Sequence, residues 1–223
     1  MSRPIFDSIT MQGALCWPSK TKMWLYLKIN LTLNLLFVVV YGGANQLASL
    51  RDNPYHFFTE WERNIPLVPA MIYVYMSISI LFWLPLFVLD AEHLRRLGVA
   101  VAICIMIAGL CFVLFPGTTG FVTMPFTQTN DSIESCLFDM LHRLDKPYNT
   151  APSLHVSLST LIMLATNHSV VSRRLRTALL LWLCIIMLSV VLVHQHHLMD
   201  VVTGWILGYG CYLHYRHGIR TIN

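Results

Sequence analysis

The sequence has few charged residues. Only 12% of its 223 residues are Asp, Glu, Lys or Arg, while 56% are hydrophobic; an ordinary soluble domain carries roughly 25% charged residues. This deficit excludes an ordinary water-soluble domain and indicates that lipid covers most of the surface. The net charge of +4 is not a nucleic-acid signal, because the basic residues form short clusters between apolar runs.

The chain also lacks the cysteine pattern of a disulfide framework and the His/Cys spacing of a metal site. Its six cysteines are Cys104, Cys111, Cys184 and Cys211 inside apolar runs, Cys16 before the first run, and Cys136 in a connecting segment. No internal repeat, low-complexity tract or linker interrupts the sequence. A single domain is therefore predicted.

Six apolar runs separate the charged clusters. They are roughly Met23–Tyr41, Pro66–Leu89, Leu97–Phe115, Ser153–Asn167, Thr177–Val193 and Met199–Tyr215. A helix needs ~20 residues to cross the ~30 Å hydrocarbon core, and the first, second, third and fifth runs meet that length. The fourth and sixth are shorter, and each by itself is compatible with a buried or re-entrant helix, but the charge pattern requires both crossings. We predict an all-α integral membrane protein: a bundle of six transmembrane helices with a long outer loop between spans three and four.

The basic residues are distributed unequally between alternate connections. With the N-terminus inside, ten Lys and Arg residues lie in inner segments, four lie in outer segments and Lys28 lies within the first run. The inner residues are Arg3, Lys20, Lys22, Arg95, Arg96, Arg173, Arg174, Arg176, Arg216 and Arg220; the outer ones are Arg51, Arg63, Arg143 and Lys146. Cytoplasmic loops are enriched in Lys and Arg, so we predict that both termini are cytoplasmic.

These boundaries divide the chain into three segments. Residues 1–22 are predicted to form a cytoplasmic N-terminal segment, 23–217 the six-helix membrane domain and 218–223 a cytoplasmic tail. The first run is too long for the apolar region of a signal peptide and no clean cleavage site follows it, so we expect it to be a retained span.

Two segments on the predicted outer side combine histidines with helix starts. The longest loop, residues 116–152, leads directly into Pro152-Ser153-Leu154-His155, and the loop before the last span reads His194-Gln195-His196-His197-Leu198-Met199-Asp200. Ionisable residues at a lipid boundary are expensive, so they indicate a function. A single histidine near a helix end is usually structural, and we expect that role for His142, His194, His197 and His214.

His155 and His196 have chemically suggestive neighbours. His196 and Asp200 are four residues apart, so they share a helical face if the last span begins near His196. A carboxylate bonded to one ring nitrogen fixes the tautomer and raises the basicity of the other nitrogen, which prepares a histidine for nucleophilic attack. His155 follows Pro-Ser at a helix start, where free N–H groups favour a phosphate.

These residues resemble motifs of the type 2 phosphatidic acid phosphatase superfamily. Pro152-Ser153-Leu154-His155 is similar to its Pro-Ser-x-His motif, and Ser189 through Asp200 is similar to Ser-Arg-x5-His-x3-Asp. The resemblance covers roughly residues 66–215. It implies that His196 attacks phosphorus and forms a phosphohistidine, that Asp200 orients it, that His155 protonates the leaving group and that Ser153 contacts phosphate oxygens. This chemistry requires no metal or other cofactor.

The sequence departs from the family motifs at the phosphate-binding cations. Val190 stands where the last motif has Arg, and the first motif, Lys-x6-Arg-Pro, is absent. A hydrogen bond between a cationic side chain and the substrate phosphate contributes about 1.5–3 kcal/mol. We therefore expect another basic residue to supply the missing contacts. Lys146 is the first candidate, followed by Arg143 and Arg63. In lacking these cations the sequence resembles the head-group transferase branch of the superfamily, which includes inositol phosphorylceramide and sphingomyelin synthases.

Together these features predict a membrane-embedded lipid phosphatase with its site at the extracytoplasmic face and a phosphorylated lipid as substrate. The 116–152 loop is expected to lie over the site as a partial lid. A head-group phosphotransferase that uses the same histidine pair is the first alternative, and an inactive membrane scaffold or transporter is the second. Membrane lipids are the expected surroundings, and no nucleic-acid partner is expected. The sequence does not identify the lipid, the acceptor or the oligomeric state.

Overall fold

The computed structural model describes residues 17–51, 54–121, 133–144, 148–170 and 172–220. Its helices are α1 (Lys20–Ala48), η1 (Glu60–Asn64), α2 (Met71–Met76), α3 (Ile78–Val88), α4 (Ala91–Leu114), α5 (Ile133–Leu144), α6 (Leu154–Ser169), α7 (Arg173–Leu192) and α8 (Leu198–Arg220). Over these residues the only β pairing is an isolated bridge between Tyr55 and Gly117. The all-α prediction is therefore confirmed for the described part of the chain.

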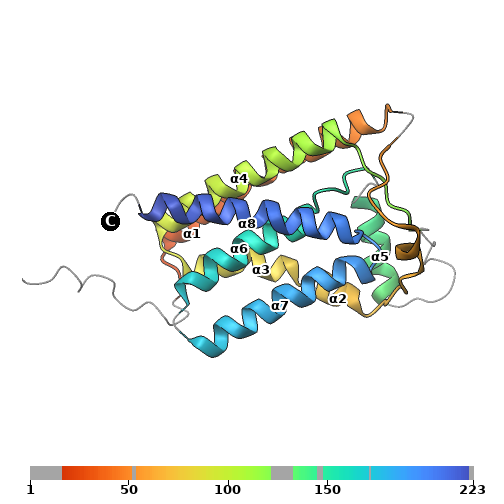
Figure 1. The fold of residues 1–223 in the computed structure, drawn as a ribbon. Helices are drawn as coiled ribbons and strands as arrows, with labels where there is room; N and C mark the ends of the chain where they lie inside the picture. The colour runs from red at the N-terminus through yellow and green to blue at the C-terminus, as the bar shows by residue number, and fades with distance from the viewer. Residues whose placement is uncertain (1–16, 52–53, 122–132, 145–147, 171, 221–223) are drawn as a thin grey trace, which may run out of the picture.

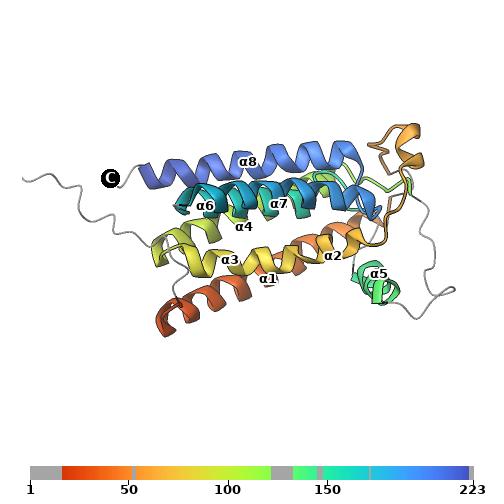
Figure 2. The same ribbon diagram turned by 90° about the horizontal axis from the view of Figure 1, so that it is seen from below.

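The long helices run lengthwise beside one another in a bundle (Figure 1). The connections that follow α1, α4 and α7 lie at one end, together with α5, which stands beside the bundle there (Figure 2). The opposite end holds the C-terminus and the connections that follow α3 and α6. We call these the α5 end and the C-terminal end. This alternation matches the two groups of connections that the basic residues distinguish.

Among the described residues, four helical segments are long and apolar enough to cross a membrane: α1, the α2–α3 pair (Met71–Val88), α4 and α7. The chain is thus a multi-pass membrane protein. The six-span prediction is confirmed for these four and stays a prediction for α6 and α8. Neighbouring helices explain the composition of α6, because α3, α4, α7 and α8 surround it. Its buried Ser157, Ser159, Thr160 and Thr166 face protein instead of lipid.

The connection between α4 and α6 contains a helix, which the sequence analysis did not predict. This helix, α5, is joined to α2 by a hydrogen bond of 2.8 Å from the Tyr73 hydroxyl to Glu134 Oε1. The other end of the connection also touches the bundle, since the N–H of Gly120 donates to His197 Nε2 at 3.0 Å. Residues 122–132 and 145–147 of the 116–152 loop lie outside the described residues, so the partial lid stays a prediction.

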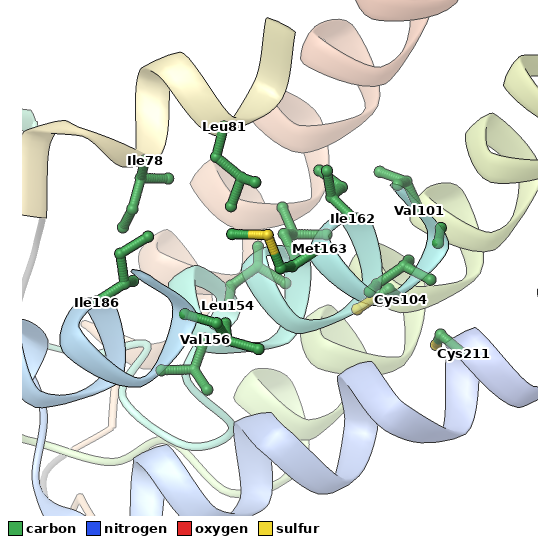
Figure 3. Close-up of a cluster of buried hydrophobic side chains, with 14 of the residues drawn as sticks. Ile78, Leu81, Val101, Cys104, Leu154, Val156, Ile162, Met163, Ile186 and Cys211 are labelled. Carbon is green, nitrogen blue, oxygen red and sulfur yellow. The ribbon is translucent and has the colours of Figure 1, made fainter. Parts of the chain in front are cut away.

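The core surrounds α6. Figure 3 shows Ile78 and Leu81 from α3 and Ile186 from α7 approaching the α6 side chains, with Cys104 and Cys211 on the opposite side. All of these side chains are buried. The described cysteines, Cys104, Cys111, Cys136, Cys184 and Cys211, are free thiols.

Two glycines let α8 pack closely against α6. A Cβ added to Gly204 would lie 2.6 Å from the carbonyl oxygen of Ser153, and one added to Gly208 would lie 2.3 Å from that of Ser157. Small residues four positions apart are a common means of close helix approach in membranes. This approach brings the start of α6 against the first turns of α8.

We expect Gly208→Ala to destabilise the bundle by about 1–3 kcal/mol, because the added methyl group meets backbone that cannot move aside. Gly210→Ala is the matched control, since nothing lies within 4 Å of its added Cβ. Thermal unfolding of the two purified variants in the same detergent measures the difference. Equal melting temperatures would show that α6 and α8 are less tightly packed than described.

Candidate active site

The start of α6 is bonded directly to the first turn of α8. The N–H of Ser153 donates to the carbonyl oxygen of Asp200 at 2.9 Å. Ser153 is also the N-cap of α6, where its buried hydroxyl accepts the N–H of Val156 at 3.4 Å. Such a cap satisfies one of the donors left free at a helix start. The hydroxyl is thus engaged in capping, and its predicted contact with a phosphate stays a prediction.

The structure brings the two predicted catalytic histidines together. His155 Nδ1 lies 3.4 Å from His196 Nε2, although the residues are 41 positions apart in sequence. The other nitrogen of His155, Nε2, is 2.8 Å from the hydroxyl of Tyr75 on α2. Tyr75 therefore fixes the orientation of the His155 ring and leaves its Nδ1 facing His196.

Asp200 lies on the other side of the His196 ring. Its Oδ2 is 3.5 Å from His196 Nδ1 and accepts the N–H of His197 at 2.9 Å. Both His196 and Asp200 are almost fully buried. The sequence argument placed them on one helical face, but α8 begins at Leu198, so His196 precedes the helix. The contact forms because the chain turns just before α8.

Within the described residues, the basic side chains predicted to replace the motif cations do not contact His196 or Asp200. Arg63 is exposed and pairs with Glu60 at 3.0 Å, and Arg143 is exposed near the end of α5. Neither has a hydrogen bond or ion pair with His196 or Asp200 there. Lys146, the first candidate, lies outside the described residues. The described part holds no group of three or more His, Cys, Asp or Glu side chains placed for a metal ion.

A family model supplies the identification that this geometry anticipates. The model of the PAP2 superfamily matches residues 55–214, which is most of the chain and includes both histidine segments. The chain belongs to the PAP2 superfamily. Members of this superfamily are phosphatases or phosphotransferases, which supports an enzyme that acts on phosphoric esters. No curated protein and no solved structure matches the chain.

Two further residues of this PAP2 site, Glu62 and His197, were not predicted to take part in it. Both are buried, and His197 Nδ1 lies 3.3 Å from Glu62 Oε2. The His197 ring stacks between Phe58 and Phe121, with ring centroids 4.4 and 4.1 Å away. Nothing in the sequence could connect these residues, because they come from three separate connections.

The charge states of His197 and Glu62 follow from their surroundings. Burial lowers the pKa of His197, although Asp200 and Glu62 oppose the shift, so the ring is neutral near pH 7. Its Nε2 accepts the N–H of Gly120, so its proton is on Nδ1 and points toward Glu62. Burial by itself raises the pKa of Glu62, but N–H donors from Thr59 and Leu198 outweigh it and hold the pKa below its ordinary value.

His194 lies beside His197, and the structural role predicted for both histidines stays a prediction. His194 stacks on Phe121 with ring centroids 4.1 Å apart, and its Nε2 is 2.9 Å from the carbonyl oxygen of Ile65. Burial lowers the pKa of His194 despite that hydrogen bond. His194 and His197 thus both stack on the ring of Phe121.

Proposed function

We propose that the chain is a membrane-embedded lipid phosphatase that works through a phosphohistidine on His196. The observation that carries the proposal is the contact between His155 Nδ1 and His196 Nε2, with Asp200 at the opposite nitrogen of His196. The nitrogen that would attack phosphorus therefore faces the group that would donate a proton. A carboxylate at the other nitrogen holds a proton there and stabilises the charge that develops on attack.

The reaction would proceed in two steps. First, His196 Nε2 forms a bond to phosphorus while the bond from phosphorus to the leaving oxygen breaks, and His155 gives that oxygen its proton. Second, neutral His155 takes a proton from water, the water oxygen bonds to phosphorus, and the N–P bond breaks to release phosphate. Histidine's ordinary pKa of ~6.5 allows both protonation states near neutral pH.

A head-group phosphotransferase is the second candidate, because Val190 replaces the arginine of the motif. Val190 is fully buried, and its carbonyl oxygen accepts the N–H groups of Gln195 and His196. It provides backbone support but no cation. In a transferase, a lipid alcohol would attack the phosphohistidine in place of water, and the first step would be unchanged.

A substrate panel distinguishes these functions. Purified protein would be incubated with phosphatidate, a polyprenyl diphosphate and a phospholipid with a head group, with and without a lipid alcohol. Released inorganic phosphate supports the phosphatase, and a labelled head group on the added alcohol supports the transferase. No reaction with any member of the panel would favour the inactive scaffold.

We further propose that α6 and α8 also cross the membrane, with both termini in the cytoplasm and the histidine pair at the outer face. The unequal distribution of Lys and Arg between the two ends supports this orientation. A reporter fused to the C-terminus should then be active only when it is of a kind that works in the cytoplasm. Activity of a reporter that works only outside would contradict the proposed orientation.

A further inference from the structure

Glu62 sits at the centre of a contact between two distant connections. Its Oε1 accepts the N–H and the hydroxyl of Thr59, at 2.9 and 2.8 Å. Its Oε2 accepts the N–H of Leu198 at 2.8 Å and lies 3.3 Å from Nδ1 of His197. Glu62 is 3% exposed, so water contributes little to this arrangement. Both oxygens of the carboxylate therefore face donors only.

These contacts hold the segment that carries the proposed nucleophile. Leu198 is the first residue of α8, and its N–H is one of the donors that a helix start leaves free. Asp200 Oδ2 accepts the N–H of the preceding residue, His197. On the other side, the N–H of His196 donates to the carbonyl oxygen of Val190 at 3.0 Å. His196 thus lies between one anchor on α7 and a second anchor supplied by Glu62.

We infer that Glu62 is a positioning residue for the reaction, which fixes the start of α8 so that Asp200 and His196 keep their mutual orientation. This inference rests on the proposed function of His196. Glu62 acts through Leu198 and His197, because these are the residues that it contacts. The ring stack of Phe58, His197 and Phe121 supports the same segment from the side.

The variant Glu62→Gln tests this role, because an amide cannot accept at both ends. Its NH2 group would face either the donors of Thr59 or those of Leu198 and His197, whereas its size stays the same. We expect kcat to fall by on the order of 10- to 100-fold with little change in KM, since a small misplacement of reacting groups affects the chemical step. Glu62→Asp keeps the charge and should recover part of the lost kcat.

Glu60→Gln is the matched control. Glu60 belongs to the same short helix, η1, but is exposed and pairs only with Arg63 among the described residues. Its kcat should equal that of the unmodified protein. Kinetics would be measured on full-length protein in one detergent, with the phosphorylated lipid that gives the highest turnover in the panel. Thermal unfolding would be recorded for each variant.

The outcomes separate a positioning role from a merely structural one. A lower melting temperature for Glu62→Gln with kcat within about twofold of the control would overturn the inference. If Glu62→Gln does not fold, the variant Thr59→Val is used in its place, because it removes one hydrogen-bond donor to the same carboxylate. A lower kcat for Thr59→Val supports the inference, and an unchanged kcat overturns it. His196→Ala is assayed beside them. Full turnover in His196→Ala would refute the proposed function itself, which is a distinguishable result.

Discussion

His196→Ala should abolish turnover, because no other described group occupies the position from which Nε2 would attack phosphorus. We expect the loss to reach the detection limit of the assay, since the reaction would have no covalent route. Brief incubation with radiolabelled substrate should leave acid-labile phosphate on the unmodified protein and none on the variant. His214→Ala is the control, because His214 is an exposed residue of α8 near the C-terminal end of the bundle.

Asp200→Asn extends the same test to the partner of His196. The amide oxygen of Asn can still accept the N–H of His197, so the start of α8 keeps its hydrogen bond. The negative charge beside His196 Nδ1 is lost, however, and turnover should fall by about 10²–10⁴-fold, as when an orienting carboxylate is replaced in a catalytic triad. Substantial turnover in His196→Ala would contradict the proposed nucleophile, and substantial turnover in Asp200→Asn would contradict the proposed role of Asp200.

The long helices of the bundle could be predicted because each apolar run has polar boundaries, whereas η1 and α5 lie between the runs and were not predicted. The basic residues at alternate connections also indicated that successive long helices reverse direction, and the bundle does so. Composition could not assign α6 to lipid or to the protein interior. Its serines and threonines are buried by four neighbouring helices, and this arrangement depends on tertiary packing that hydropathy does not encode.

The histidine pair could be predicted because its residues stand in two short motifs. Their supporting residues could not, because they belong to no local pattern. Tyr75 is one aromatic residue within an apolar run, and only the packing of α2 near the start of α6 makes it a partner of His155. Glu62 lies 136 residues from Leu198, whose N–H it accepts. A single sequence contains no signal for such a contact.

The motifs carry less information about the groups that would bind phosphate than about the histidine pair. The buried hydroxyl of Ser153 caps α6, and its expected contact with phosphate stays a prediction. Arg63 was chosen for its charge and predicted side of the membrane; it pairs with Glu60 at the surface, and its phosphate-binding role stays a prediction. Short motifs encode the positions of residues along a helix, but the orientation of a loop side chain depends on neighbours that the motif does not include.

His155→Ala should have an effect that depends on the leaving group. If His155 donates the proton, kcat/KM should fall by about 10²–10⁴-fold for alkyl phosphates, whose leaving alkoxides need protonation. The loss should become small for nitrophenyl phosphate, because its leaving group departs without a proton. The ratio kcat/KM is the right quantity, since it reports formation of the phosphohistidine and excludes the later attack of water, in which His155 would act as a base.

Tyr75→Phe is the companion variant, because it removes only the hydroxyl that lies 2.8 Å from His155 Nε2. The ring of Tyr75 stays in place, and His155 keeps its Nδ1 near His196. We expect a smaller loss than for His155→Ala but the same dependence on the leaving group, since proton donation would be weakened without being removed. A loss in His155→Ala that is equal for all leaving groups would show that His155 is not the acid, and that its contact with His196 serves to position the nucleophile.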